Sequence, residues 1–184
     1  AGGSIGSELC RQIIKNQPAK IIIYELTEFA LYHIDKELRL TANCEIIPIL
    51  GSVLDERKLE RVIEQYGVQT VYHAAAYKHV PLVECNPLAG LKNNAVGTAF
   101  SVNAAVKKGV ETFVLISTDK AVRPTNVMGA TKRMAELYCQ AMAEAQNQTQ
   151  ISIVRFGNVL GSSGSVVPLF KQQIAKGGPI TVTD

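Results

Sequence analysis

Five short apolar runs alternate with segments of helical spacing, and this alternation constrains the fold more than any other feature. The runs are residues 19–25, 44–52, 68–76, 111–118 and 150–158. Apolar residues recur every three to four positions in the helical segments 4–15, 27–39, 55–66, 86–108 and 128–146. Nearly continuous apolar strands are typical of a parallel sheet that helices cover on both faces. Because crossovers between parallel strands are right-handed, the sequence predicts a doubly wound α/β fold.

Turn and cap residues support these boundaries. Asp55 is predicted to cap the third helical segment, with Lys58 in the first turn in place of the Glu of a capping box. Gly67 and Gly109 stand where a glycine ends a helix. The segment 157–168 is rich in Gly and Ser and is interpreted as a functional loop.

The N-terminal segment AGGSIGSE is typical of the turn that opens a phosphate-binding βα unit. Gly3 and Gly6 would let the backbone approach a pyrophosphate, and the helix that follows adds its positive end. About twenty residues further on, a strand ends at Glu25, where a carboxylate can accept hydrogen bonds from an adenosine ribose. The sequence therefore predicts a Rossmann-like domain that binds NAD, with NADP left open and Glu28 as the alternative ribose ligand.

No strand precedes this glycine turn, although the first strand is central in a doubly wound sheet. Its absence would leave buried backbone groups unpaired, at about 1–3 kcal/mol each. The chain also ends on a strand-like segment, PITVTD. We therefore expect residues 1–184 to be one NAD(P)-binding domain truncated at both ends, which lacks its first strand and the C-terminal substrate-binding part and is inactive by itself.

Charge and hydropathy argue against two classes of partner. The net charge of +3 is small and the basic residues are scattered, so no nucleic-acid surface is expected. No apolar run approaches the roughly 18–20 residues that a membrane span needs, and the first residues show no signal-peptide pattern. We expect no membrane contact by this chain.

Cysteine and histidine spacing gives no sign of a metal site. The cysteines share no CxxC spacing and are predicted to be buried free thiols in a reducing compartment: Cys10, Cys44, Cys85 and Cys139. The histidines show no ligand spacing with them: His33, His73 and His79. No metal is predicted.

Reactive side chains gather after the fourth apolar run. Thr118 and Asp119 follow the carboxyl end of that strand, where open α/β sheets bind ligands, and Lys120 comes next. Lys132 lies about one helical turn after Met128, on the same helix face. A hydroxyl facing a lysine beside a dinucleotide suggests hydride transfer, and the added acid–base pair suggests elimination. The alternatives are a turn role for Asp119, a solvated surface position for Lys120, and a packing role for Met128 that still lets it line the site.

At these residues the sequence resembles the nucleotide-sugar 4,6-dehydratases of the extended short-chain dehydrogenase/reductase superfamily. Within them it is similar to the bacterial polysaccharide-biosynthesis group that acts on UDP-N-acetylglucosamine. The matching stretches span essentially the whole chain: GGSIGSE, HAAAYKHVPLVE, NNAVGT, STDKAVRPTNVMGATKR and VRFGNVLGSSGSVVPLF. The superfamily usually carries Ser/Thr and Tyr-x-x-x-Lys, whereas this chain has Thr118, Met128 and Lys132. Methionine at the tyrosine position resembles a membrane-associated branch that retains the configuration at C5, so the resemblance implies a subfamily.

The resemblance implies a catalytic set of Thr118, Asp119, Lys120, Met128 and Lys132. In the reaction that the resemblance implies, NAD⁺ would take hydride from C4 of the hexose, and the hydride would later return to C6. Lys120 would remove the C5 proton, and Asp119 would protonate the departing C6 hydroxyl. Because Met128 cannot accept a proton, the C4 hydroxyl proton needs another acceptor. Asp119, through Thr118 or water, is the candidate.

The resemblance also implies the binding residues. The cofactor would contact Gly3, Ser4, Ile5, Gly6, Glu25, Ser52, Val53, Ala74, Ala75, Ala76 and Lys132. The sugar nucleotide would contact Lys78, Asn158, Ser165 and Val166. Asn94 is expected to hold loops together, and His79 is interpreted as structural.

Two other functions stay open. One is a sugar-nucleotide 4-epimerase or reductase of the same extended group, which would need no Asp119–Lys120 pair. The other is a non-catalytic dinucleotide-binding module, against which the intact reactive cluster argues. The resemblance further implies a UDP-sugar substrate, a homo-oligomer, and a place in the cytoplasm or at the cytoplasmic face of the inner membrane, with membrane helices preceding this chain in the full-length protein.

Overall fold

The strands form two parallel sheets in the computed structural model, which describes residues 1–159 and 166–181. β1 (Lys20–Glu25) pairs with β2 (Glu45–Leu50). In the second sheet, β4 (Thr112–Thr118) lies between β3 (Thr70–His73) and β5 (Gln150–Phe156). All five expected strands are confirmed, each with narrower bounds.

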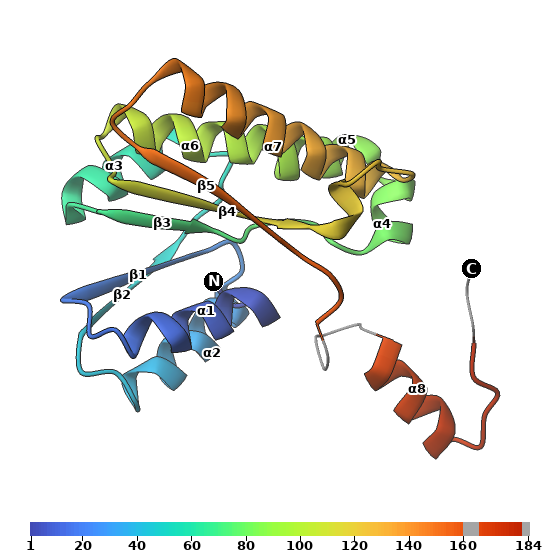
Figure 1. The fold of residues 1–184 in the computed structure, drawn as a ribbon. Helices are drawn as coiled ribbons and strands as arrows, with labels where there is room; N and C mark the ends of the chain where they lie inside the picture. Colours follow the sequence, from blue (N-terminus) through green and yellow to red (C-terminus); the bar gives the residue numbers. More distant parts are fainter. Residues whose placement is uncertain (160–165, 182–184) are drawn as a thin grey trace.

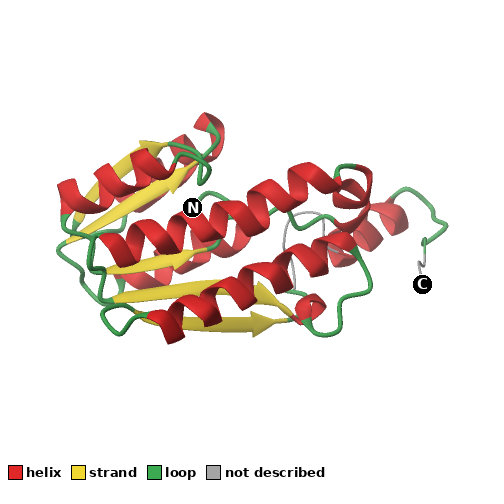
Figure 2. Cartoon of the chain, turned by 90° about the horizontal axis from the view of Figure 1, so that it is seen from above, coloured by secondary structure: helices red, strands yellow, loops and turns green. Residues whose placement is uncertain are grey.

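The sheet is divided between β1 and β3. Among the residues that the structure describes, no hydrogen-bonded pairing joins these two strands. Both views place the N-terminus near this division (Figures 1 and 2). The division falls where the doubly wound order places its first strand, which agrees with the expectation that this strand is lacking.

The main helices cover opposite sides of the strands. α1 (Ser4–Ile14) and α2 (Glu28–Arg39) lie on one side, next to β1 and β2 (Figure 1). α3 (Glu56–Tyr66), α6 (Gly97–Lys107) and α7 (Val127–Ala145) lie on the other, with α7 packed on β4 and β5. This arrangement confirms the doubly wound α/β fold.

The helical segment expected at residues 86–108 has three parts. α5 (Pro87–Leu91) runs through a π-helical turn, η1 (Lys92–Val96), into α6. The sequence pattern did not predict α4 (Val80–Cys85), the 3₁₀ turn η2 (Asp119–Ala121) or α8 (Val166–Ala175). α8 begins inside the segment interpreted as a loop, of which residues 160–165 lie outside the described part. Residues 179–181 of the strand-like C-terminal segment are not in a strand, which corrects that expectation for them.

The expected helix ends are confirmed. The carboxylate of Asp55 accepts a hydrogen bond from the backbone N–H of Lys58 at 3.0 Å. Gly67 and Gly109 have φ values of 58° and 68°, a left-handed conformation that favours glycine.

Each sheet has its own apolar core. On β4 alternate residues are buried, and Phe113 and Leu115 pack with Val102, Ala135 and Cys139 from α6 and α7. The β1–β2 core is formed by Cys10, Ile21, Ile23, Leu31, Ile34, Leu38 and Ile46. All four cysteines are free, as expected, but Cys44 is only half-buried and Cys85 is exposed, which corrects the expectation that all of them are buried.

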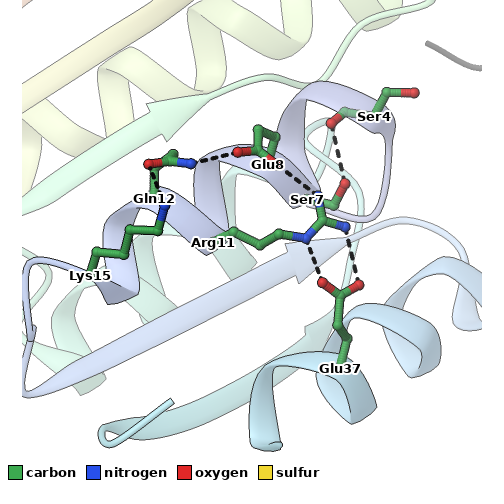
Figure 3. Close-up of polar contacts among 7 residues, drawn as sticks. All are labelled: Ser4, Ser7, Glu8, Arg11, Gln12, Lys15 and Glu37. Carbon is green, nitrogen blue, oxygen red and sulfur yellow. Dashed lines mark hydrogen bonds and ion pairs between the residues drawn. The ribbon is translucent and has the colours of Figure 1, made fainter. Parts of the chain in front are cut away.

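A surface ion-pair network joins α1 to α2. Arg11 donates to Glu37 of α2 and also pairs with Glu8 at 2.8 Å (Figure 3). Exposed pairs of this kind contribute little stability, about 0–1 kcal/mol.

Candidate active site

One cavity of about 740 Å³ opens at the carboxyl ends of the strands. One part of the cavity is lined by the glycine turn, the ends of β1 and β2, and the loop after β3. The other part is lined by the ends of β4 and β5 and the start of α7. Sixteen residues singled out from the sequence line it: Gly3, Ser4, Ile5, Gly6, Glu25, Ser52, Val53, Ala74, Ala75, Ala76, Lys78, Thr118, Lys120, Met128, Lys132 and Asn158. Residues that are distant in the sequence thus meet around one space.

Three site residues of the sequence analysis are not among the described residues that line the cavity. Asp119 is next to it, hydrogen-bonded to Thr118 and Lys120, which do line the cavity. Ser165 lies outside the described residues, and Val166 begins α8, with a side chain that is also outside them.

The glycines of the N-terminal turn have different roles. A Cβ on Gly2 would lie 2.5 Å from the Cβ of Ala30, and one on Gly6 would lie 2.5 Å from the carbonyl oxygen of Ala1. A Cβ on Gly3 would meet nothing within 4 Å. Gly2 and Gly6 therefore allow close packing, while the surface at Gly3 is open beside the cavity. Gly3 is also the N-cap of α1 and makes no side-chain cap, so the helix start can accept an anion.

Glu25 is held against this turn. Its Oε2 accepts a hydrogen bond from the N–H of Gly2 at 2.7 Å. Glu25 lines the cavity, whereas Glu28 is an exposed first residue of α2 and does not.

The reactive cluster after β4 is joined by hydrogen bonds. Thr118 Oγ1 donates to Asp119 Oδ1 at 2.9 Å, and Lys120 Nζ donates to the same oxygen at 3.2 Å. Lys120 Nζ also donates to Asn158 Oδ1 at 3.1 Å, from the end of β5. The hydrogen bond from Thr118, followed by the effect of Lys120, lowers the pKa of Asp119. A hydroxyl, a carboxylate and an amine are thus connected beside the cavity.

Met128 and Lys132 face the cavity from α7, and both are only 4% exposed. Lys132 Nζ donates to the carbonyl oxygen of Ile116 at 2.7 Å. Burial lowers the pKa of Lys132 to about 8. Met128 is thus buried and also lines the cavity, as its interpretation as a packing residue expects.

The start of α7 is fixed closely against the reactive cluster. Asn126 caps the helix by accepting from the N–H of Gly129 at 2.8 Å, and Glu84 of α4 accepts from the N–H of Val127 at 2.6 Å. A Cβ on Gly129 would overlap the carbonyl oxygen of Lys120. Gly129 therefore allows the helix to approach the 3₁₀ turn that carries Asp119 and Lys120.

Asn94 holds loops together, as expected. Its Nδ2 donates to the carbonyl oxygen of Tyr77 at 3.0 Å and to Thr131 Oγ1 at 3.1 Å, and its Oδ1 accepts from the N–H of Tyr77 at 2.8 Å. The fully buried side chain ties the loop after β3 to α7. His79 is exposed at the N-cap of α4 and lines the cavity.

The sequence analysis missed several cavity residues. Tyr24 lines the cavity, and its hydroxyl donates to the carbonyl oxygen of Ser52 at 3.0 Å. Burial raises the pKa of Tyr24 to about 12. Tyr77 also lines the cavity and is 45% exposed. A tyrosine inside an apolar run resembles a core residue, so no sequence signal separated Tyr24 from its neighbours.

Two further searches cover only the described part of the chain. Residues 1–159 and 166–181 contain no group of three or more His, Cys, Asp or Glu side chains placed to hold a metal ion. The helices in the same ranges are too short or too polar to cross a membrane.

The divided parallel sheet, the glycine turn and the cavity at the strand ends define a Rossmann-like protein of the short-chain dehydrogenase/reductase type. The chain belongs to the family described as "Polysaccharide biosynthesis protein", which matches residues 1–184.

Individual relatives agree with this assignment. The chain is 50% identical to the capsular polysaccharide biosynthesis protein CapD of Staphylococcus aureus, over 100% of this chain and 31% of CapD. It is 40% identical to a UDP-N-acetylglucosamine 4,6-dehydratase (inverting) of Campylobacter jejuni, over 98% of this chain and 54% of that enzyme. The X-ray structure of Pen from Bacillus thuringiensis matches with a TM-score of 0.91 at 33% identity, over 100% of this chain and 58% of Pen. The chain thus spans about a third to a half of its curated relatives.

Proposed function

We propose that the full-length protein catalyses NAD(P)-dependent 4,6-dehydration of a UDP-N-acetylhexosamine, most specifically UDP-N-acetylglucosamine. The product would be a 4-keto-6-deoxy sugar nucleotide for surface polysaccharide or glycan synthesis. The observation that carries the proposal is the hydrogen-bonded series Thr118–Asp119–Lys120–Asn158 beside a cavity that the glycine turn also lines. An acid and a base at one carbohydrate-sized site suit an elimination, and simple oxidation needs no such pair.

The residues present fit a dinucleotide. The open surface at Gly3 and the start of α1 would hold the pyrophosphate, and Lys132 the nicotinamide ribose. Ala74, Ala75 and Ala76 leave room along the cavity for the cofactor rings. When bound, the nicotinamide would take hydride from C4 of the sugar and return it to C6.

The chain's own groups account for the protons. Thr118 donates its hydroxyl hydrogen to Asp119, so its oxygen can accept the proton of the C4 hydroxyl and pass its own to the carboxylate. Asp119, once protonated, can give that proton to the departing C6 hydroxyl, which leaves as water. The amine of Lys120 would take the C5 proton and return it to C5 after hydride reaches C6. This route needs no titratable side chain at Met128.

The product decides between the candidate functions. We expect the full-length protein, incubated with NAD⁺ and UDP-N-acetylglucosamine, to release a 4-keto-6-deoxy sugar nucleotide whose NMR spectrum also gives the C5 configuration. A C4 epimer with its C6 hydroxyl intact would contradict the proposal. Tight NAD binding without any product would instead indicate a non-catalytic module.

A 4-epimerase is the second candidate because a UDP-glucose 4-epimerase is among the curated relatives of this chain. That reaction moves hydride at C4 alone and leaves the Asp119–Lys120 pair without a role. The pair is therefore the feature that favours dehydration.

We propose that the cofactor is NAD, with NADP as the alternative, because of the carboxylate of Glu25. Replacing Glu25 with Gln should lower the preference for NAD over NADP by about tenfold, because the carboxylate repels a 2′-phosphate. Dissociation constants for both cofactors, measured by calorimetry, give this ratio.

The matched control is Glu28→Gln, which removes an exposed carboxylate outside the cavity lining and should leave the ratio unchanged. An unchanged ratio in the Glu25 variant would remove Glu25 from the ribose site.

We also propose the wider context of this chain. Residues 1–184 would be the NAD(P)-binding domain of a homo-oligomer that works in the cytoplasm or at the cytoplasmic face of the inner membrane. The UDP-sugar would contact Lys78, Asn158, Ser165 and Val166. Because the relatives extend well beyond this span, we expect residues 1–184 alone to show no turnover.

A further inference from the structure

Glu136 is a buried carboxylate that no step of the proposed reaction uses. Its side chain is 0% exposed and accepts four hydrogen bonds. Ser117 Oγ donates at 2.6 Å, Arg155 donates from Nε at 2.7 Å and from Nη2 at 2.5 Å, and Arg133 Nη1 donates at 3.0 Å. Burying a charge is costly unless it is paired and hydrogen-bonded in this way.

The partners of Glu136 stand next to the reactive groups. Ser117 directly precedes Thr118 on β4, and Arg155 lies on β5, three residues before Asn158. Glu136 itself lies four residues after Lys132, on the same face of α7. One carboxylate thus ties together the three elements that carry Thr118, Asn158 and Lys132.

The charge of Glu136 also acts on Lys132. Burial lowers the pKa of Lys132, and Cys139 and then the carboxylate of Glu136, both on α7, oppose this. From β3, His73 faces the same region, and burial lowers its pKa to about 3, so it is neutral near pH 7. The other charged groups at the end of β4 are Asp119 and Lys120, which pair with each other.

Glu136 stays ionised over the working pH range. Burial alone would raise its pKa, but the hydrogen bonds from Arg155, Ser117 and Arg133 lower it to about 2. Its negative charge is therefore constant while Lys132 titrates.

We propose that Glu136 is a positioning residue of this site: it holds the Lys132 helix against the ends of β4 and β5 and so places the Lys132 amine for binding the cofactor ribose. This inference deepens the proposed function and rests on it for the identity of the cofactor.

Glu136→Gln in the full-length protein tests this inference, because it keeps the shape of the side chain and removes the charge. We expect the Lys132 amine, followed by ¹⁵N NMR of labelled lysine and assigned with Lys132→Arg, to lose its proton at lower pH. The NAD dissociation constant at pH 8 should rise about tenfold. Glu64→Gln is the matched control, since Glu64 pairs with Lys108 on the surface, at 2.8 Å. An unchanged Lys132 titration and an unchanged dissociation constant would overturn the inference.

Two further variants keep the test decisive. Glu136→Asp retains the charge, so it should restore the titration of Lys132 toward the wild-type value; failure to do so would count against the charge effect. If Glu136→Gln does not fold, Ser117→Ala is the replacement test, because it removes only the 2.6 Å hydrogen bond from Ser117 Oγ to Glu136. We then expect NAD binding to weaken a few-fold, and unchanged binding would overturn the positioning role. None of these readouts requires turnover, so the absence of a dehydrated product would be a separate failure, that of the proposed function.

Discussion

Asp119→Asn and Lys120→Met should each lower the dehydration rate of the full-length protein by about 10²–10⁴-fold, the usual contribution of a general acid or base. Asparagine still offers an oxygen to Thr118 Oγ1, which now donates to Asp119 at 2.9 Å, but it cannot take up or release the proton. Methionine keeps the length of Lys120 and removes the amine. Single-turnover and steady-state rates, followed by NMR of the sugar product, measure the loss.

NAD binding should be unchanged in both variants, because neither side chain belongs to the glycine turn or the Glu25 region of the cavity. Glu64→Gln and Lys108→Met remove the partners of a surface ion pair and serve as controls of the same chemical type. Full turnover by either site variant would show that the acid and base lie elsewhere. A loss of NAD binding equal to the loss of rate would point to a disturbed fold.

Gly129→Ala should destabilise the protein and reduce its activity, although helix propensity alone predicts the reverse. Alanine is favoured over glycine inside a helix by about 1 kcal/mol. At this position, however, the added methyl group would overlap the backbone carbonyl oxygen of Lys120, which cannot rotate away as a side chain can. Overpacking of this kind costs about 1–3 kcal/mol. Urea unfolding of the wild type and the variant gives the difference in free energy.

Ala141→Gly is the paired measurement, since Ala141 is exposed on the same helix. It should cost up to about 1 kcal/mol from propensity alone. Opposite substitutions on one helix would then both destabilise it. A Gly129→Ala variant that is more stable than the wild type, with full activity, would show that α7 does not depend on this close approach.

Local patterns were sufficient for the sheet, the glycine turn and the residues at the strand ends. Short apolar runs such as 111–118 predict buried strands. Successive side chains of a strand point to opposite faces of the sheet, so a strand that helices cover on both faces is apolar at almost every position. The carboxyl end of such a strand is a binding edge in any open α/β sheet, so Thr118 and its neighbours could be assigned without coordinates. Glu25 was predicted by the same argument, with Glu28 as the alternative, and the structure adds that Glu25 lines the cavity whereas Glu28 does not.

Other features could not be predicted from the sequence because their local patterns are weak or absent. α4 (Val80–Cys85) is only six residues long and contains a proline, so no helical period can develop in it. The π-helical turn at Lys92–Val96 depends on one inserted residue within a continuous helix, which leaves the apolar pattern nearly unchanged. Glu136 looks like an ordinary surface carboxylate in an amphipathic helix, because its partners Ser117 and Arg155 are 19 residues away on either side.

The class of fold and the kinds of side chain in the site can therefore be predicted from local sequence. The apolar runs, the turn glycines and the reactive motifs each lie within a few consecutive residues. The hydrogen bond from Lys120 to Asn158, the contact of Gly129 with Lys120 and the burial that shifts Lys132 arise from packing between separate elements. Those relations depend on the distances and the local dielectric that the folded chain creates. Only the tertiary structure could decide them, because residues that are far apart in the sequence supply both the partners and the apolar surroundings.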